Sequence, residues 1–399
     1  MESNELRRLV EANRDRIVAF CQRIVQMPSL TGEEGHLAEY VIEHMEALGY
    51  DEALIDSAGN VIGHVRGGSG RSTLLHAHLD VVDPGDPARW TDPPYSGALR
   101  DGWIWGRGAA DDKGCVAAQV YAAGLLKEAD LLPAGDVYVA AVVGEEVGGL
   151  GSRYLAGSFH PDLAIIGEPS SNTLRRGHRG RFEFLVSLRG RSAHASQPAR
   201  AINPHYDLAR FLLALKDLDM HAEAVTGGST VAPTLLRSDQ RSSNVIPGEL
   251  TLHLDWRNAP GETLEEAMSK LQGLLDATLG GETTYSLSVR SEHVVSYTGY
   301  EQQVLQAVAP FWMETDDPLL ITAEATLRQA LGRPVVVDVW PFYTDGGFLY
   351  GAGVPCIGFG PGDPGMAHVF DERLSVGELL EAVVGYMALA LHMGQAASE

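Results

Sequence analysis

The stretch LLHAHLDVVD, residues 74–83, places ionisable side chains inside a run that otherwise has the composition of a buried β-strand. Side chains alternate between the two faces of a strand, so His76, His78 and Asp80 share one face. The residues between them are apolar. Burying ionisable groups is costly, so they do not stand at the end of an apolar strand for stability. The stretch therefore predicts a strand that carries histidine and aspartate side chains into a functional site.

Apolar runs of strand length recur around this stretch and alternate with segments of helical periodicity. The expected strands include NVIGHVR (60–66), DVYVAAVV (136–143) and DLAIIG (162–167). The segment KGCVAAQVYAAGLLKEA (113–129) has the composition of a helix. This alternation predicts an α/β sheet covered by helices on both faces.

Two segments near the N-terminus are also predicted to be helical. The first covers residues 4–27, where apolar residues recur at helical spacing. The second follows Thr31 and Glu34, which form a plausible capping box, and Gly49 is expected to stop it.

The pattern changes near residue 178. From there the order of expected elements is β-α-β-β-α-β, which is the ferredoxin-like arrangement. The α/β pattern returns after about residue 295. We therefore expect a small domain, residues 179–291, inserted into a larger domain made of residues 1–178 and 292–399.

Composition limits the class of protein and its partners. The 399 residues include 53 acidic and 30 basic side chains, a formal net charge of −23, which disfavours nucleic acid and anionic membranes as partners. Three widely spaced cysteines fit a reducing compartment. With no signal-peptide core and no membrane-length apolar run, the sequence is interpreted as that of a soluble cytoplasmic protein.

Acids and histidines gather in five short motifs at expected strand ends or in the adjoining loops. Open α/β sheets bind ligands at the carboxyl ends of their strands. Clusters of His, Asp and Glu without thiolates suit zinc, manganese or cobalt in a hydrolytic site. The motifs are HAHLD (76–80), GRGAADDKG (106–114), GEEVGG (144–149), GEPS (167–170) and AHVFDE (367–372).

With these motifs in this order, the sequence resembles the M20 family of metallopeptidases and amidohydrolases. That family includes acetylornithine deacetylase, succinyl-diaminopimelate desuccinylase, glutamate carboxypeptidases and aminoacylase-1, and the resemblance covers nearly the whole chain. It implies a zinc-peptidase-like catalytic domain with a mixed sheet and two divalent metal ions, usually Zn²⁺, with Co²⁺ or Mn²⁺ as alternatives. It also implies that the inserted ferredoxin-like α+β domain acts as a lid and as the interface of a homodimer.

The resemblance assigns roles to the motif residues. His78 and Glu168 would bind the first metal, Glu146 and His368 the second, and Asp111 would bridge the two. A cis peptide is expected to follow the bridging residue.

Two further residues receive catalytic roles from the resemblance. Asp80 would orient the imidazole of His78. Glu145 would be the general base, since a carboxylate beside the metal-bound water can take its proton. The sheet geometry does not decide which of Glu145 and Glu146 is base and which is ligand, so that division also comes from the resemblance.

Residues expected to meet the substrate come from the inserted domain and from one glycine-rich loop. His194 would stabilise the oxyanion from the partner subunit, or be a surface histidine. Asn244 would hydrogen-bond substrate, or be a turn residue. Arg257 would hold a substrate carboxylate, or form a salt bridge within the sheet. Gly346 and Gly347 could offer backbone N–H groups to a carboxylate.

The expected activity is hydrolysis of an amide bond in an N-acyl amino acid or a small peptide with a free carboxylate. Asp112 follows the bridging residue at a position where many deacylases have methionine, which leaves the choice between deacylase and peptidase open. A dinuclear di-/tripeptidase or aminopeptidase is the alternative within hydrolases. A non-catalytic protein that binds metal or amino acids is the alternative from another class.

Overall fold

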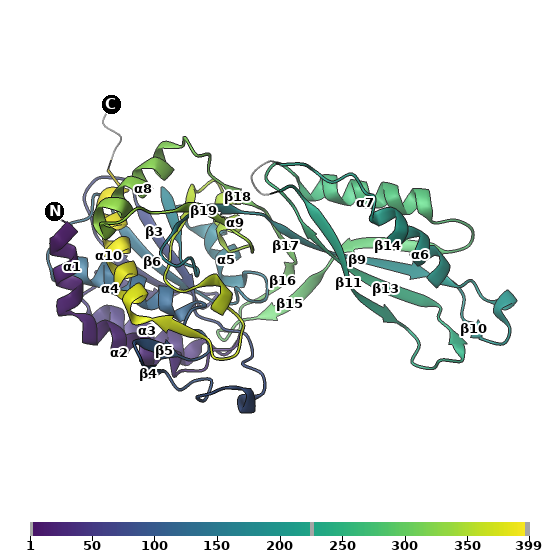
Figure 1. Cartoon of the computed structure of the whole chain (residues 1–399), viewed down its shortest axis with the longest axis horizontal. Coiled ribbons are helices and arrows are strands. Elements are labelled where there is room, and N and C mark those ends of the chain that lie inside the picture. The colour runs from purple at the N-terminus through teal and green to yellow at the C-terminus, as the bar shows by residue number, and fades with distance from the viewer. Residues whose placement is uncertain (1–2, 224–226, 396–399) are drawn as a thin grey trace. The chain divides into compact units, whose positions relative to one another are not determined.

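The structure is a computed structural model that describes residues 3–223 and 227–395 (Figure 1). The chain divides into two compact units. Unit 1 comprises Met1–His178, His293–Val304 and Phe311–Glu399, and unit 2 comprises Arg179–Glu292 and Leu305–Pro310.

Unit 1 is built on a nine-stranded mixed sheet. The path of hydrogen-bonded neighbours runs in the order β1-β2-β6-β3-β7-β20-β8-β18, and β19 pairs with β8. The strands are β1 (Glu52–Ile55), β2 (Val61–Val65), β3 (Thr73–His78), β6 (Val137–Val142), β7 (Leu163–Ile166), β8 (Leu174–His178), β18 (Phe311–Trp312), β19 (Val337–Trp340) and β20 (Cys356–Gly358).

The centre of this sheet is parallel. Strand β3 runs parallel to β6 on one side and to β7 on the other, and β7 runs parallel to β20. The outer pairs β1/β2, β2/β6 and β8/β18 are antiparallel. The carboxyl ends of β3, β6 and β7 therefore meet at the same edge of the sheet.

Helices cover both faces of the sheet, as the alternation of elements predicted. Leu75, Ala77 and Leu79 pack into the larger core, together with α1, α2, α3, α4, α8 and α10. Leu74 lies in the core of the opposite face, with α5 and α9. The helices are α1 (Ser3–Ala12), α2 (Arg14–Val25), α3 (Gly35–Ala47), α4 (Lys113–Glu128), α5 (Leu150–Ser158), α8 (Pro318–Leu331), α9 (Gly346–Gly351) and α10 (Val376–His392).

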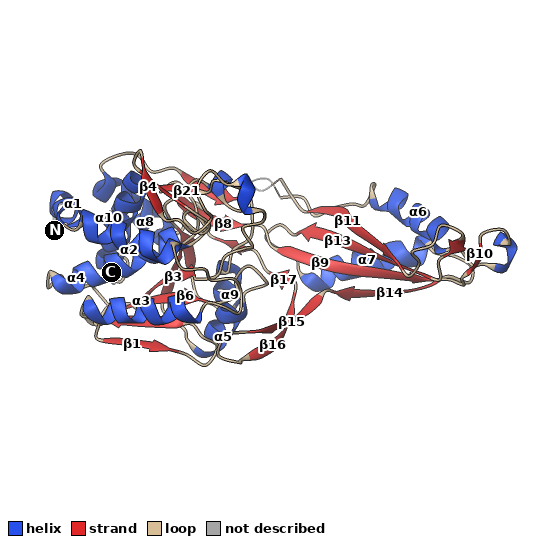
Figure 2. Ribbon diagram, turned by 90° about the horizontal axis from the view of Figure 1, so that it is seen from below, coloured by secondary structure: helices blue, strands red, loops and turns tan. Residues whose placement is uncertain are grey.

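Unit 2 has its own sheet and its own core. Its strands follow the antiparallel order β11-β13-β9-β14, and β17 also pairs with β9. Numbered along the chain, this is the ferredoxin-like order 4-1-3-2 with α6 and α7 as the two helices (Figure 2). The elements are β9 (Arg181–Arg189), α6 (Pro204–Leu215), β11 (Thr230–Ser238), β13 (Glu249–Arg257), α7 (Leu264–Thr278), β14 (Thr284–Val289) and β17 (Ala307–Val308).

Three smaller sheets complete the fold. One is three-stranded, in the order β21-β5-β4, and the other two are the pairs β10/β12 and β15/β16. Their strands are β4 (Ala98–Arg100), β5 (Trp103–Trp105), β10 (Ala193–His194), β12 (Val245–Ile246), β15 (Ser291–Val295), β16 (Glu301–Leu305) and β21 (Arg373–Ser375). Within the residues that the structure describes, every helix is too short or too polar to cross a membrane.

Two local predictions were wrong. The helix expected over residues 4–27 is interrupted at Asn13, which separates α1 from α2. The capping box does not form, because the Thr31 hydroxyl donates to Asp80 and Glu34 lies at the N-cap position of α3 itself. The stop at Gly49 is confirmed, since this glycine follows α3 with a φ of 80°.

Candidate metal centre

The parallel strands of unit 1 place the predicted acids and histidines at one edge of the sheet. Strand β3 ends at His78, and its neighbour β6 leads into the glutamates of the GEEVGG turn. Strand β7, on the other side of β3, leads into Glu168. Asp111 lies just before α4, with a cis peptide bond between it and Asp112.

Five candidate ligand residues form two clusters that share one aspartate. The first cluster is His78, Asp111 and Glu168, and the second is Asp111, Glu146 and His368; within each, potential ligand atoms lie within 4.8 Å of one another. Asp111 Oδ1 lies 3.0 Å from His78 Nε2, and its Oδ2 lies 3.4 Å from His368 Nε2. One carboxylate therefore presents one oxygen to each cluster.

The two clusters open into a common cavity of about 170 Å³. Aromatic side chains contribute to its wall beside the acids. The lining residues are Asp111, Glu145, Glu146, Glu168, Phe342, Tyr343, Ala367 and His368. Glu145 therefore faces the cavity without belonging to either cluster.

The imidazole of His78 is oriented by its neighbours. Its Nδ1 lies 2.9 Å from the backbone carbonyl of Asp80 and 3.4 Å from the Asp80 carboxylate. With a proton on Nδ1, the Nε2 atom beside Asp111 would have the lone pair that a metal ligand needs. The backbone N–H of His78 donates to Asp112 Oδ2 at 3.0 Å, which fixes the strand end as well.

The Asp80 carboxylate does more than the sequence predicted. Its Oδ1 accepts the backbone N–H of Glu145 at 3.1 Å, and its Oδ2 accepts that of Glu146 at 3.2 Å. The Thr31 hydroxyl donates to the same carboxylate at 2.8 Å. Asp80 thus ties the GEE turn to the end of β3.

Buried negative charge dominates the electrostatics. Burial, reinforced by Asp111 and Asp112, raises the pKa of Glu168 well above its usual range. Burial, reinforced by Asp345 and Glu146, does the same to the pKa of Glu145. Carboxylates crowded into a dry cavity favour either bound protons or bound cations.

This donor set fits two divalent cations. Each cluster offers carboxylate oxygens and one imidazole nitrogen, the ligands that zinc, manganese and cobalt accept in hydrolytic sites. A shared carboxylate between two cations suits paired metal sites. Burial, reinforced by neighbouring carboxylates, raises the pKa values of Glu145 and Glu168, and bound cations would favour the charged form of such groups.

His76 is a buried histidine with a supporting contact. Its Nε2 lies 2.7 Å from the Ser152 hydroxyl, and it belongs to neither cluster. Burial, together with the neighbouring His78, lowers the pKa of His76 to about 3, so its ring is neutral near pH 7.

Two of the predicted substrate residues form one corner of unit 2. His194 pairs with Val245 in the β10/β12 ladder, and the Asn244 carbonyl accepts the backbone N–H of Ala195 at 2.9 Å. His194 Nδ1 accepts the backbone N–H of Ser196 at 3.1 Å, which places the ring proton on Nε2. The histidine is exposed and has a donor nitrogen available.

Arg257 stands at the last position of β13 and is engaged within the sheet. Its Nε donates to Asp255 Oδ1 at 2.6 Å and its Nη2 reaches Asp255 Oδ2 at 3.3 Å. Arg181 donates to the same carboxylate at 2.8 Å. The salt bridge that the sequence offered as the alternative role of Arg257 is therefore present.

The predicted glycine pair lies at the start of α9, not in a loop, and uses its N–H groups internally. Gly346 N donates to the Thr344 hydroxyl and Gly347 N to the Thr344 carbonyl, both at 3.2 Å. A substrate carboxylate would have to displace these bonds. The small size of Gly346 has another reason, since a Cβ there would lie 2.7 Å from the Phe311 ring.

Sequence reasoning missed two buried residues beside the clusters. Glu372 is fully buried and accepts the backbone N–H groups of Ala110 and Asp111 at 2.9 and 3.0 Å. Arg107 donates to the same carboxylate at 2.5 Å. Both lie inside motifs that were singled out, but Glu372 binds two backbone N–H groups of a distant segment, a contact that a sequence pattern does not display.

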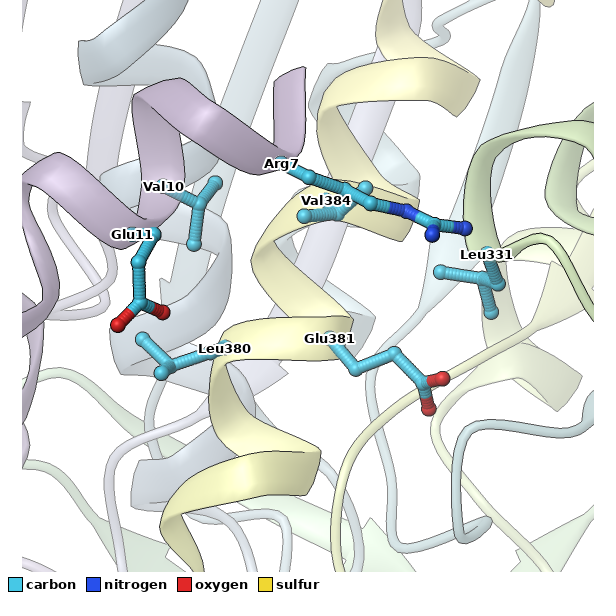
Figure 3. Close-up of a pocket in the computed structure, with 7 residues that line it drawn as sticks. All are labelled: Arg7, Val10, Glu11, Leu331, Leu380, Glu381 and Val384. Carbon is cyan, nitrogen blue, oxygen red and sulfur yellow. The ribbon is translucent and has the colours of Figure 1, made fainter. Parts of the chain in front are cut away.

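A second cavity in unit 1 lacks this chemistry. It measures about 250 Å³ and lies between α1, α8 and α10 (Figure 3). Arg7 in its wall donates to the Ala330 carbonyl, and Glu381 pairs with Arg333 at 2.7 Å. Neither metal-type cluster includes a residue of this wall. The lining residues are Arg7, Val10, Glu11, Leu331, Leu380, Glu381 and Val384.

Comparisons with known proteins show the family of the chain. Residues 74–392 match the family described as Peptidase family M20/M25/M40. An uncharacterised protein of Escherichia coli K12, YgeY, is 29% identical over 93% of each chain. Succinyl-diaminopimelate desuccinylase of Paracoccus denitrificans is 31% identical, over 68% of this chain and 74% of that protein. The crystal structure of aminopeptidase PepT from Bacillus cereus superimposes with a TM-score of 0.76 at 18% identity, covering 96% of this chain and 99% of that one.

Proposed function

The chain belongs to peptidase family M20/M25/M40 and is a hydrolase, and from this premise we propose that it is a di-metal amidohydrolase of small substrates. The expected substrate is an N-acyl amino acid or a short peptide with a free carboxylate. The observation that carries the proposal is Asp111, whose two oxygens face two separate His/carboxylate clusters.

The two metals would be held by the residues of those clusters. His78 and Glu168 would hold the first, Glu146 and His368 the second, and Asp111 would contribute to both. Zn²⁺ is the expected metal, and Co²⁺ or Mn²⁺ would suit the same donors. When bound, such a pair polarises the scissile carbonyl and lowers the pKa of a water molecule to about 7.

Glu145 is the proposed general base. It lines the cavity, and its backbone is fixed through Asp80, yet it lies outside both clusters. Its carboxylate is therefore free to take a proton from the attacking water and to deliver it to the leaving amine. Burial raises the pKa of Glu145, which suits a group that must hold this proton between the two steps.

Unit 2 is proposed to supply the remaining contacts as a lid. His194 would donate its Nε2 proton to the developing oxyanion, with Asn244 beside it hydrogen-bonding substrate. Arg257 would receive the substrate carboxylate, with Asp255 holding its guanidinium in place. Closure of a lid would also exclude water.

The proposed lid residues lie too far apart to serve one small substrate from one chain. His194 adjoins the first end of β13 and Arg257 is its last residue, a separation of about 26 Å for eight residues at about 3.3 Å each. Figure 1 shows β10 at one end of unit 2. This separation supports a homodimer in which one subunit contributes Arg257 to a site and its partner contributes His194.

The relatives leave two substrate classes to compare. The desuccinylase relative supports an N-acyl amino acid, and the fold shared with an aminopeptidase keeps a peptide with a free amine as the alternative. Among the residues that the structure describes, those lining the cavity of the metal centre include no lysine or arginine. The proposed choice of an N-acyl substrate therefore depends on Arg257. The free buried cysteines support a reducing, cytoplasmic setting.

An assay of acylated amino acids beside dipeptides and tripeptides tests the proposal. Protein treated with a chelator is expected to lose activity and to regain it with Zn²⁺, Co²⁺ or Mn²⁺. Acetylated and succinylated amino acids are expected to be the better substrates. Preference for peptides with a free amine would favour the aminopeptidase alternative, and activity that survives complete metal removal would contradict both.

A further inference from the structure

The second cluster is less well supported by secondary structure than the first. In the first, His78 ends β3, and Gly167 beside Glu168 donates its N–H to the His76 carbonyl at 2.6 Å. In the second, His368 lies in a loop, its side chain is 52% exposed, and its φ of 62° is in the left-handed region. Such a conformation persists only where surrounding contacts hold it.

Glu372 supplies a contact of this kind. It lies four residues after His368, on the same loop, and is fully buried. Its Oε1 accepts two consecutive backbone N–H groups, from Ala110 at 2.9 Å and Asp111 at 3.0 Å. Its own carbonyl accepts the Gly106 N–H at 2.9 Å. One residue therefore joins the loop of His368 to the segment that carries the bridging aspartate.

Arg107 completes the arrangement. Its Nη1 donates to Glu372 Oε2 at 2.5 Å, and its guanidinium lies 5.2 Å from the centre of the Trp90 ring. The Arg107–Glu372 pair is buried. Replacing the Glu372 carboxylate by water would therefore leave the buried Arg107 cation without its partner. Asp371, on the same loop, accepts the backbone N–H and the hydroxyl of Thr91 instead.

We propose that Glu372 is a positioning residue that fixes the separation of Asp111 and His368 and thereby sets the affinity of the second metal position. The inference rests on the proposed di-metal function. Asp111 and His368 both contribute to the second cluster, and Glu372 connects the segments that carry them. Substituting a residue that orients metal ligands typically lowers metal affinity about 10- to 100-fold.

Metal titration tests this role without relying on catalysis. Chelator-treated protein is titrated with Zn²⁺ by calorimetry, and with Co²⁺ by absorption as a spectroscopic readout. The unsubstituted chain is expected to bind two ions. Glu372→Met keeps the side-chain volume but removes the acceptors, and it is expected to bind the first ion normally and the second about 10- to 100-fold more weakly.

Two further variants sharpen the comparison. Glu372→Gln keeps one acceptor oxygen for the backbone N–H groups, so it is expected to weaken the second ion less than the methionine variant does. Glu262→Ala removes a buried carboxylate of unit 2 that accepts Trp256 Nε1 at 2.8 Å and Lys270 Nζ at 2.9 Å. This matched control is expected to leave both metal affinities unchanged.

The outcomes separate this inference from the function on which it rests. Wild-type affinity for both ions in Glu372→Met, or equal weakening of both, overturns the role of Glu372 alone. If that variant does not fold, Glu372→Gln decides in the same way: selective weakening of the second ion supports the role, and unchanged affinities overturn it. An unsubstituted chain that binds fewer than two ions contradicts the di-metal function itself.

Discussion

Asp80 acts through two different groups of atoms. Its backbone carbonyl lies 2.9 Å from His78 Nδ1, and its carboxylate accepts the consecutive N–H groups of Glu145 and Glu146. One residue just after β3 therefore orients a proposed ligand of the first metal and also the turn that carries the proposed base and a proposed ligand of the second.

The division of labour between the adjacent glutamates gives a prediction. Glu145→Gln removes the carboxylate that would accept the proton but keeps the size of the side chain. Because Glu145 belongs to neither cluster, the variant should bind two metals with unchanged affinity. Its kcat should fall at least about 10²-fold, the scale of general acid–base catalysis. Single-turnover kinetics on the metal-loaded variant measures this, and near-normal turnover would exclude Glu145 as the base.

Glu34 gives a prediction about pH. It is fully buried, and burial, reinforced by Asp80, raises its pKa from 4.5 to about 8. Between these two pKa values, the folded protein keeps a proton that the unfolded chain releases. Glu34 therefore lowers the free energy of unfolding as pH rises, by up to about 1.4 kcal/mol per pH unit.

Glu34→Gln should remove this effect. The variant should gain stability relative to the wild type as pH rises from about 5 to about 8, and the gain should level off above the window. Urea unfolding of both chelator-treated proteins across the range measures it. Parallel stability curves for the two proteins would show that Glu34 does not titrate in this way.

At the scale of elements, the start of α9 is limited by space. A Cβ at Gly346 would lie 2.7 Å from the Phe311 ring and 3.0 Å from Ile166, whereas one at Gly351, the last residue of the same helix, would meet nothing within 4 Å. Gly346→Ala should therefore cost about 1–3 kcal/mol through overpacking. Gly351→Ala, the control, should be neutral or slightly stabilising. Urea denaturation measures both, and equal stabilities would contradict the steric argument.

The central elements could be predicted because burial there leaves a clear pattern. Strands β2, β3, β6 and β7 and helix α4 all occur where apolar runs and helical periodicity placed them. Strand β8 (Leu174–His178) was not expected, because its sequence LRRGH is polar although every residue of it is buried. Its Arg175 donates to the Val339 carbonyl, a partner far away in sequence. Burial of this kind depends on tertiary partners.

In the candidate site, too, contacts between distant segments could not be predicted from the sequence. The resemblance grouped His78, Asp111 and Glu168, and the structure brings them into one cluster. It did not reveal Glu372, whose partners include two backbone N–H groups, or the bond from Thr31 to Asp80. Ligand residues recur as recognisable motifs, whereas the contacts that hold them depend on how distant segments meet.

At the scale of the whole molecule, the proposed exchange of His194 between subunits makes a quantitative prediction. Glu145→Gln and His194→Ala should each be nearly inactive as homodimers. In a mixed dimer, one site receives both substitutions. The other site has an unsubstituted Glu145 from its own chain and an unsubstituted His194 from the partner. Random reassembly of equal amounts should therefore restore about one quarter of wild-type activity, because half of the dimers are mixed and each has one working site. No recovery on mixing, with exchange verified by mass spectrometry of the dimers, would place His194 in the same chain as its site.

The route of the chain limits how this protein can be divided. Residues 305–310 return to unit 2 after an excursion of twelve residues, His293–Val304, in unit 1, and β17 within them pairs with β9. A fragment that stopped at Glu292 would leave the start of β9 without that partner, whereas one that ran to Pro310 would keep it but would also carry the β15/β16 pair, whose Val294 and Val304 pack with Leu150 of unit 1. Gene fusions or domain exchanges that treat the inserted domain as one continuous block would therefore cut through a hydrogen-bonded sheet.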